Sequence, residues 1–223
     1  MNEILHQIQT TSDGSPTLVS GRVGDLYHSR HGARTESEVV FIQAGLEFQS
    51  NRLARPICVA EIGLGTGLNA YLTWLWALNK NHEVWYEALE PFPLDPEICM
   101  DWKNQMAWEA PELWSMLHHQ HPGENLVGGV FNFSWQQAFW PEAVFSRPPD
   151  VLFFDAFAPG TQPELWTKES FQHAFDVLSP DGILVTYCAK GEVKRNLKSA
   201  GFSIEALPGP PGKREITRAL KGI

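Results

Sequence analysis

The stretch Asp150–Gly160, DVLFFDAFAPG, decides the fold of this chain. Its four apolar residues, Val151–Phe154, form a run of the length expected for a strand that is buried on both faces. The run leads directly into Asp155, which an aromatic residue and then Pro159 and Gly160 follow. A carboxylate in that position lies at the carboxyl end of a buried strand, where open α/β sheets hold their chemistry.

A second apolar run precedes a glycine-rich turn upstream. Ile57–Ala60 is followed by Glu61 and by the sequence IGLGTG at residues 62–67, and a helical pattern begins at Leu68. This order predicts a buried strand, a tight turn and a helix. Two buried strands are therefore expected to end in glycine-rich or acidic loops.

Strand and helix patterns alternate along the rest of the chain. Together they predict an α/β, Rossmann-like, doubly wound sheet that is mostly parallel and ends in an antiparallel edge hairpin. We expect residues 1–51 to be an N-terminal extension packed on the core and residues 52–223 to be one globular unit. The expected helices are Glu36–Phe48, Leu68–Asn79, Asp95–Asn104, Ala110–His118, Lys168–Leu178 and Glu192–Ala200. The expected strands are Ile57–Glu61, Glu83–Glu90, Leu126–Phe133, Asp150–Phe154, Ile183–Cys188, Phe202–Leu207 and Arg214–Leu220.

Composition excludes several classes of protein. No apolar run approaches the ~20 residues of a membrane span, and the start of the chain lacks the pattern of a signal peptide, so we expect a cytoplasmic protein. Three cysteines, widely spaced, predict neither a disulfide framework nor a zinc site, and we expect no metal. The net charge is −9, yet residues 190–223 hold eight Lys and Arg against three Glu, a net charge of +5. This tail is either a solvated surface or a face that binds phosphates.

The glycine turn indicates the kind of cofactor. Gly63, Gly65 and Gly67 alternate, which departs from the dinucleotide pattern G-x-G-x-x-G, and no Lys-Ser/Thr pair follows as in nucleotide triphosphate loops. The backbone can approach a ligand closely there, while Glu61 attracts a cation or an ammonium group. S-adenosylmethionine is such a ligand.

Two further residues fit this cofactor. Glu90 ends the second predicted strand, where an acid can accept both ribose hydroxyls. No acid follows the third predicted strand, so we assign the adenine amino group to Ser134, with Gln136 and a stacked Trp135 as alternatives. The alternative interpretation, in which the glycine turn is an ordinary tight turn and Glu90 is a surface glutamate, stays open at this point.

Asp155 suits methyl transfer to an amine. The reaction is an in-line displacement that needs an aligned and uncharged nucleophile, and an amine is protonated at neutral pH. A carboxylate at the edge of the cofactor site can hold the ammonium form, orient the amine after proton loss and accept a hydrogen bond from it in the transition state, with Phe157 beside the path of the methyl group. A strand-end aspartate can also merely cap the helix that begins near Lys168.

The chain resembles a known family through three motifs: EIGLGTGLN at residues 61–69, DAFAP at 155–159 with PELWT at 163–167, and GKRE at 212–215. They are similar to the methyltransferase half of the bifunctional tRNA-modifying enzyme MnmC and to its stand-alone relatives called MnmD. The resemblance covers nearly the whole chain, from about Tyr27 to Arg218. It implies a class I methyltransferase sheet and S-adenosylmethionine-dependent methylation of 5-aminomethyl(-2-thio)uridine at the tRNA wobble position.

The resemblance also implies roles for individual residues and a missing partner domain. Asp155 corresponds to the family's active-site aspartate, which also lies at the cofactor, and the glycine loop with Asn69 and Glu90 corresponds to its cofactor site. MnmC carries an FAD-dependent oxidase domain that this chain lacks, so another protein is expected to supply the aminomethyl substrate. The residues expected to contact the tRNA anticodon region are Tyr27, Arg34, Phe157, Trp166, Lys190, Lys213 and Arg214.

Two other functions remain open from the sequence. Enzymes that methylate or aminopropylate small free amines share this sheet and place an acid after the same strand, and the net acidity favours a polycationic substrate. A non-catalytic module that binds S-adenosylmethionine is the third alternative, which Asp155 beside an intact glycine loop opposes.

Overall fold

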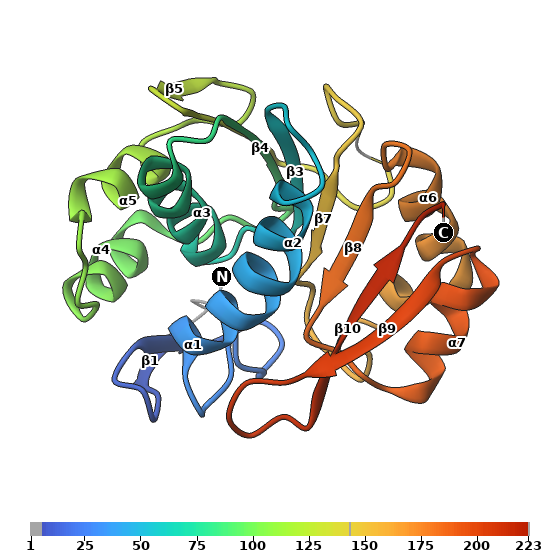
Figure 1. Ribbon diagram of the computed structural model, residues 1–223. Coiled ribbons are helices and arrows are strands. Elements are labelled where there is room, and N and C mark those ends of the chain that lie inside the picture. The colour runs from blue at the N-terminus through green and yellow to red at the C-terminus, as the bar shows by residue number, and fades with distance from the viewer. Residues whose placement is uncertain (1–5, 143, 223) are drawn as a thin grey trace.

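One sheet of eight strands, in the order β5-β6-β4-β3-β7-β8-β10-β9, forms the centre of the protein (Figure 1). The computed structural model describes residues 6–142 and 144–222. Neighbouring strands in the middle of the sheet are parallel, and the pairs at both edges are antiparallel. The strands are β3 (Ile57–Ile62), β4 (Val84–Leu89), β5 (Leu126–Gly128), β6 (Phe131–Gln136), β7 (Val151–Phe154), β8 (Ile183–Thr186), β9 (Ser203–Pro208) and β10 (Glu215–Leu220).

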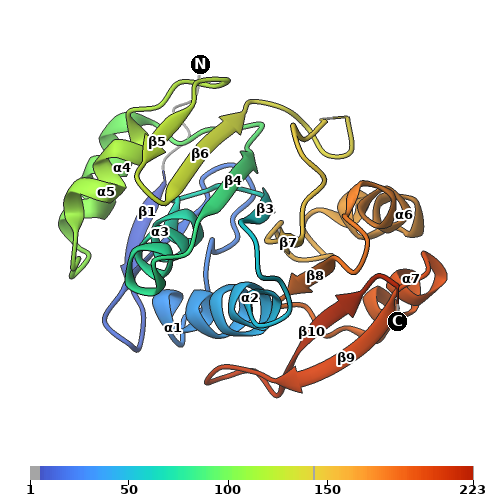
Figure 2. The same cartoon turned by 45° about the horizontal axis from the view of Figure 1, so that its top comes forward.

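Helices cover both faces of this sheet (Figure 2). The N-terminal helix and α3 to α5 lie on one face, and α6 and α7 lie on the other. The doubly wound α/β fold expected from the sequence is confirmed. The helices that follow β3 in the chain are α3 (Leu68–Lys80), α4 (Pro96–Asn104), α5 (Pro111–His118), the 3₁₀ turn η2 (Pro163–Trp166), α6 (Lys168–Val177) and α7 (Gly191–Ser199).

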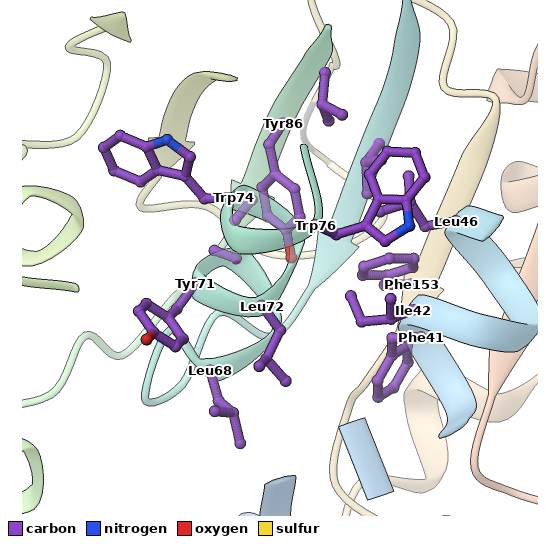
Figure 3. Packing of buried hydrophobic residues seen from close by; sticks show 14 of the residues in the cluster. Phe41, Ile42, Leu46, Leu68, Tyr71, Leu72, Trp74, Trp76, Tyr86 and Phe153 are labelled. Carbon is purple, nitrogen blue, oxygen red and sulfur yellow. The ribbon is translucent and has the colours of Figure 1, made fainter. Parts of the chain in front are cut away.

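Alternate residues of β7 serve two separate hydrophobic cores. Phe153 faces the N-terminal helix and α3, with its ring centroid 5.1 Å from that of Phe41 (Figure 3). Leu152 and Phe154 face α6 and α7 and belong to the other core. Because successive side chains of a strand point to opposite faces, a continuous apolar run is what burial on both sides requires. The sequence VLFF is therefore explained by the position of β7 in the middle of the sheet.

The N-terminal helix begins earlier and ends later than expected. It runs through α1 (Ala33–Ser37), a π-helical segment η1 (Glu38–Glu47) and α2 (Phe48–Ser50). Gly45 allows it to lie close to the sheet, because a Cβ there would be 3.0 Å from a methyl of Val185 and 3.1 Å from the Phe153 ring. The helix thus packs directly on β7 and β8, as an extension on the core would.

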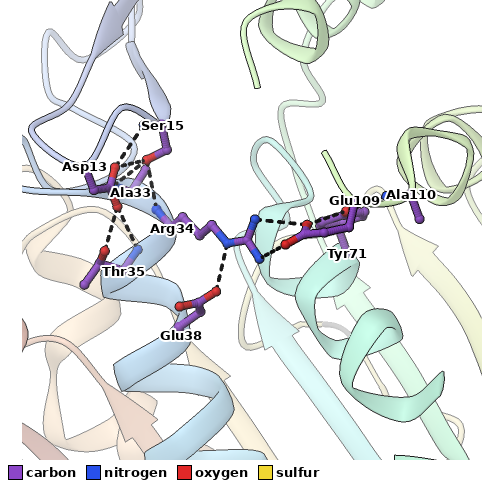
Figure 4. A network of polar contacts seen from close by, with 9 residues as sticks. All are labelled: Asp13, Ser15, Ala33, Arg34, Thr35, Glu38, Tyr71, Glu109 and Ala110. Carbon is purple, nitrogen blue, oxygen red and sulfur yellow. Dashed lines mark hydrogen bonds and ion pairs between the residues drawn. The ribbon is translucent and has the colours of Figure 1, made fainter. Parts of the chain in front are cut away.

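A small antiparallel sheet precedes this helix. It consists of β1 (Gln7–Thr10) and β2 (Pro16–Val19), which the sequence analysis did not anticipate. The Asp13 carboxylate in its turn accepts hydrogen bonds from the backbone N–H and the hydroxyl of Thr35, at 3.0 and 2.7 Å (Figure 4). These bonds fix the hairpin to the first turn of α1.

The expected single strand Leu126–Phe133 is wrong. The structure has a hairpin instead, in which β5 pairs with β6 and Gly129 takes the turn with φ of +68°. The terminal hairpin is confirmed, and β10 lies between β8 and β9. The division of the chain at residue 51 stays a prediction. Within the described residues, no helix is long and apolar enough to cross a membrane.

Candidate active site

A cavity of about 1120 Å³ lies at the carboxyl ends of β3, β4 and β7. The chain winds away from β3 towards β4 on one side and towards β7 on the other, so the strand order reverses at this point. Open α/β sheets bind their ligands in the crevice that such a reversal creates. The walls come from the glycine loop, from the segments after β4, β6 and β7, and from residues 20–31, which cover the opening.

Two of the three predicted glycines line the cavity. Gly63 has φ of +92°, and a Cβ there would lie 2.9 Å from the carbonyl oxygen of Asp155. Gly65 has φ of +51°, and its Cβ would lie 3.0 Å from the ring of Tyr27. Any side chain at either position would therefore be strained and would displace a wall of the cavity.

The third glycine serves the helix rather than the cavity. Gly67 is the N-cap of α3 with φ of +74°, and His118 lies against it. Burial lowers the pKa of His118 to about 4, so the ring is neutral and its Nε2 donates to the carbonyl oxygen of Thr66 at 2.9 Å. The described lining of the cavity does not include Gly67. The structure gives Gly67 a role in the turn, and its contact with the cofactor stays a prediction.

Glu90 faces the cavity directly after β4. Its side chain is nearly buried, and its two oxygens accept the backbone N–H groups of Gly65 and Phe92, each at 2.9 Å. Burial raises the pKa of Glu90, and the two N–H donors and the nearby Arg22 oppose that rise. The carboxylate is thus fixed against the glycine loop, in the position from which a strand-end acid accepts ribose hydroxyls.

One amide nitrogen joins the two other predicted acids. Nδ2 of Asn69, in the first turn of α3, donates to Oε1 of Glu61 and to Oδ2 of Asp155, both at 2.8 Å. Burial raises the pKa of Glu61 to about 8, and burial followed by the charge of Glu61 raises the pKa of Asp155 well above its usual range. A base with a raised pKa is suited to taking a proton from an ammonium group near neutral pH.

The far end of the cavity holds an ion pair. Lys213, from the loop between β9 and β10, donates to the Glu36 carboxylate, and its ammonium nitrogen lies 4.0 Å from the centroid of the Tyr187 ring. The second oxygen of Glu36 accepts the backbone N–H of Ser29 at 2.7 Å. The Tyr187 hydroxyl donates to the carbonyl oxygen of Ala156 at 2.9 Å. Tyr187 therefore connects this end of the cavity to Ala156, the residue that follows Asp155.

Two aromatic residues predicted for the substrate lie together in the wall. Tyr27 and Phe157 meet edge to face with ring centroids 5.1 Å apart, and both line the cavity. His28, next to Tyr27, lies 3.0 Å from the Thr66 hydroxyl through its Nε2. Thr161, after β7, donates to the Asp25 carboxylate at 2.8 Å. The covering segment is thus attached to both cofactor-side loops.

Three predicted residues lie elsewhere for clear physical reasons. Ser134 is inside β6, which continues to Gln136, so the cavity is lined by residues 137–140 of the following loop. Trp166 is 3% exposed, packs on Phe154 and donates from Nε1 to the Phe157 carbonyl oxygen at 2.8 Å, so it supports the loop from inside. Arg34 bonds both oxygens of Glu109 and one of Glu38, away from the cavity (Figure 4).

Lys190 and Arg214 are exposed and lie outside the cavity lining. Neither has an ion-pair partner within residues 6–142 and 144–222. Lys213, the direct neighbour of Arg214, points inward instead. The basic tail therefore divides into one lysine that belongs to the cavity and others that remain on the surface.

Sequence reasoning missed several lining residues. Glu36 and Tyr187 are brought to Asp155 only by tertiary packing, and no local pattern marks them. Arg22 lies over the ring of Phe92, 3.0 Å from its centroid, and Phe92 meets Phe139 edge to face at 5.4 Å. Phe92 follows Glu90 by two residues, in the loop after a predicted strand, and this position was a usable signal for a cofactor wall.

Comparison with known proteins agrees with this geometry. A family model described as S-adenosyl-L-methionine-dependent methyltransferase matches residues 142–222. The fold resembles the crystal structure of MNMC2 from Aquifex aeolicus with a TM-score of 0.78 and 27% identity, over 98% of this chain and 71% of that one. Over residues 142–222 the chain is similar to the S-adenosyl-L-methionine-dependent methyltransferases. A putative class I methyltransferase from Listeria monocytogenes shares the fold, with a TM-score of 0.51 and 13% identity, over 86% of this chain and 61% of that one.

The chain is also similar to curated proteins called tRNA 5-methylaminomethyl-2-thiouridine biosynthesis bifunctional protein MnmC. The protein from Magnetococcus marinus is 31% identical over 96% of this chain, and that from Pseudomonas paraeruginosa is 28% identical over 97%. The similarity covers 33% and 35% of those two proteins. The chain thus spans about a third of the length of the curated relatives that it matches.

The cavity fits S-adenosyl-L-methionine. Oδ1 of Asn69, a residue of the cavity lining, is buried and has no hydrogen-bond partner among the described residues. This oxygen is an acceptor of the kind that an ammonium group requires. Gly63 and Gly65 leave room for close approach, and Glu90 offers its carboxylate at the adjoining strand. The chain therefore has residues that would hold S-adenosyl-L-methionine.

Proposed function

We propose that this methyltransferase methylates the amino nitrogen of 5-aminomethyl(-2-thio)uridine at the wobble position of tRNA, in the cytoplasm. The product is 5-methylaminomethyl(-2-thio)uridine. The observation that carries the proposal is Asp155, a carboxylate with a raised pKa, held by Asn69 beside the glycine loop. The names of the relatives that align with 96% and 97% of the chain supply the nucleoside.

Asp155 acts as the base in this proposal. When bound, S-adenosyl-L-methionine supplies a methyl group on a positively charged sulfur. The Asp155 carboxylate takes one proton from the substrate ammonium group, which leaves a nitrogen lone pair free to attack. The new carbon–nitrogen bond forms as the carbon–sulfur bond breaks, and the sulfur keeps the bonding electron pair. Asn69 holds the carboxylate still, so that little reorganisation accompanies the transfer.

The far end of the cavity receives the uracil base. Tyr27 and Phe157 offer apolar ring surface for stacking, as proteins that bind unstacked RNA bases use. The base has to leave the anticodon stack to reach Asp155, because the carboxylate lies inside the cavity. Lys213 is a hydrogen-bond donor at this end, and the carbonyl oxygens of uracil are acceptors.

The surface around the opening receives the phosphates of the anticodon region. Lys190, at the N-cap of α7, and Arg214, at the start of the last hairpin strand, are exposed cations without an ion-pair partner in the described part of the chain. Arg195 and Lys198 add exposed positive charge on α7. Contacts of this kind position RNA without reading its sequence. They also give binding a dependence on salt concentration.

Transfer of labelled methyl groups tests the function directly. The protein is incubated with methyl-labelled S-adenosyl-L-methionine and either undermodified tRNA that carries the aminomethyl group or a mixture of free polyamines. We expect label in the tRNA alone, in a nucleoside that elutes as the methylaminomethyl form. Label in the polyamines alone would replace the proposal with the small-amine function.

Two variants separate catalysis from binding. Asp155→Asn keeps the shape of the side chain but removes the base, and we expect methyl transfer to fall at least ~100-fold while cofactor affinity stays within a few fold. Asp176→Asn, an aspartate on α6 outside the cavity lining, is the matched control and should transfer at the normal rate. Equal activity of Asp155→Asn and the control would show that Asp155 is not the base.

A further inference from the structure

Glu61 and Asp155 come from neighbouring strands, β3 and β7, and are bridged by one nitrogen of α3. An amide NH₂ group has two hydrogens, and Asn69 gives one to each carboxyl group at 2.8 Å. Both oxygens that receive these bonds are therefore close to the same atom. Two carboxyl groups this close do not ionise independently, because the second negative charge is opposed by the first.

The surroundings of the pair also disfavour two negative charges. Glu61 is fully buried, and burial raises the pKa of both carboxyl groups. Only one cationic side chain, Lys213, is among the charged groups that act on Asp155, and it is already paired with Glu36. The ionisable residues that face the pair are Tyr86 on β4, Glu90 after β4, Glu36 on α1, Tyr187 after β8 and Lys213 in the β9–β10 loop.

We propose that Asn69 is a positioning residue that holds Glu61 and Asp155 as one coupled acid pair, and that this pair gives up a shared proton to solvent when the cofactor binds. Asp155 then becomes a base only in the cofactor complex. The inference rests on the proposed role of Asp155 as the base, and it adds a condition on when that base is available.

The charge balance gives the physical reason. In the free protein the pair holds at least one proton near pH 7, because the pKa of each carboxyl group is raised. The cofactor brings a sulfonium, an ammonium and a carboxylate group, a net charge of +1, and Asn69 and Asp155 line the cavity that would receive it. A nearby cation favours the ionised form of a carboxyl group. The proton leaves to solvent, and the net positive charge of the bound cofactor offsets part of the negative charge that the pair gains.

This arrangement has a consequence for substrate order. An ammonium substrate that arrives before the cofactor meets a carboxyl pair that is still half protonated, so it loses its proton less readily. With the cofactor in place, Asp155 is ionised and can take that proton. The bridge by Asn69 therefore makes the basicity at the substrate end depend on the charge at the cofactor end.

Calorimetry measures this proton directly. S-adenosyl-L-methionine is titrated into the whole protein at pH 6, 7, 8 and 9 in two buffers that differ in ionisation enthalpy, and the difference in heat counts the protons released. We expect about 0.5 to 1 proton per site near pH 7. S-adenosyl-L-homocysteine, which lacks the sulfonium charge, should release about half as many.

Two variants should change the proton release on cofactor binding in different ways. Glu61→Gln still accepts the Asn69 bond but cannot hold a proton, so release near pH 7 should fall below about 0.2. Asn69→Leu has a similar volume and no donor, so both carboxyl groups hold protons more firmly and the pH of maximal release should rise by about one unit. Asn79→Ala, at the exposed end of the same helix, is the matched control and should behave as wild type.

The outcomes decide between a coupled pair and a merely structural bond. No proton release by the wild-type protein, or the same release profile in Asn69→Leu and wild type, overturns the proposal. If Asn69→Leu fails to fold or to bind the cofactor, Glu61→Gln decides alone, because undiminished release in that variant also overturns it. The titration contains no tRNA, so it succeeds or fails independently of the proposed substrate.

Discussion

Lys213 donates to the carboxylate of Glu36, although the two residues are 177 positions apart in the chain. The bond joins the last hairpin of the sheet to the first helix, and both residues line the cavity. A Cβ on Gly212, the residue before Lys213, would overlap the ring of His31, so the loop is docked tightly on the N-terminal segment. The ends of the chain therefore build the site together.

Removal of one partner of this ion pair should destabilise the protein more than removal of both partners. Lys213→Met leaves the nearly buried Glu36 carboxylate without its cation, and we expect the free energy of unfolding to fall by about 1–3 kcal/mol. The double variant Glu36→Gln/Lys213→Met removes both charges and should be more stable than Lys213→Met alone. Urea unfolding of the wild type, both single variants and the double variant gives the coupling energy. Additive losses would contradict a direct interaction.

Gly63 allows a close approach between the glycine loop and the loop of Asp155. Gly63→Ala should weaken cofactor binding and slow methyl transfer by at least ~10-fold, since the added Cβ would lie 2.9 Å from the Asp155 carbonyl oxygen. Gly123→Ala is the matched control, because Gly123 also has positive φ, +82°, but has open space around it. It should lose about 1 kcal/mol of stability and keep its affinity. Similar cofactor affinities of the two variants would show that the contact at Gly63 is unimportant.

The salt dependence of tRNA binding should separate the basic residues. Arg214→Ala and Lys190→Ala should each weaken binding and reduce the slope of log K against log salt concentration by about one. Arg34→Met should leave the slope unchanged, because Glu38 and Glu109 already occupy its guanidinium. Filter binding at four salt concentrations measures all three. A reduced slope in Arg34→Met with none in Arg214→Ala would move the tRNA path to the opposite side of the opening.

The fold was predictable where the chain follows local rules. VLFF before Asp155 and the alternating glycines after Glu61 identify strands by their length and apolarity, and the strand after Ser179–Gly182 follows the same logic. The hairpin of β5 and β6 was missed because its apolar pattern runs through the Gly128-Gly129 turn. The N-terminal hairpin was missed because its strands are only four residues long and the first of them, QIQT, is mostly polar.

The site was predictable only in part for a related reason. Asp155, Glu61 and Glu90 each end or follow a strand, so the topology alone brings them to one edge of the sheet. Trp166 could not be distinguished from a stacking platform, since its burial is decided by Phe154 and Phe171, which lie in other elements. Whether Arg34 is free to bind RNA was equally hard to predict from the sequence. A cation looks free in a sequence until the structure shows its carboxylate partner.

The buried ring of His118 should make the fold sensitive to acid. Its pKa of about 4 lies below the usual value near 6.5, so between these values the unfolded chain binds a proton that the folded protein does not. The stability that the neutral ring contributes is complete above pH 6.5 and is lost as the pH falls towards 4, by roughly 3 kcal/mol. His118→Phe preserves the ring stacked on Trp114 but cannot be protonated. It should be less stable than wild type at pH 7 by about 1 kcal/mol, because the bond to Thr66 is lost, and the gap should close or reverse at pH 4.5. Urea unfolding at both pH values measures this difference in the free energy of unfolding. The control is His119→Phe, which changes the exposed neighbouring histidine. A gap that stays constant with pH would show that folding does not lower the pKa of His118.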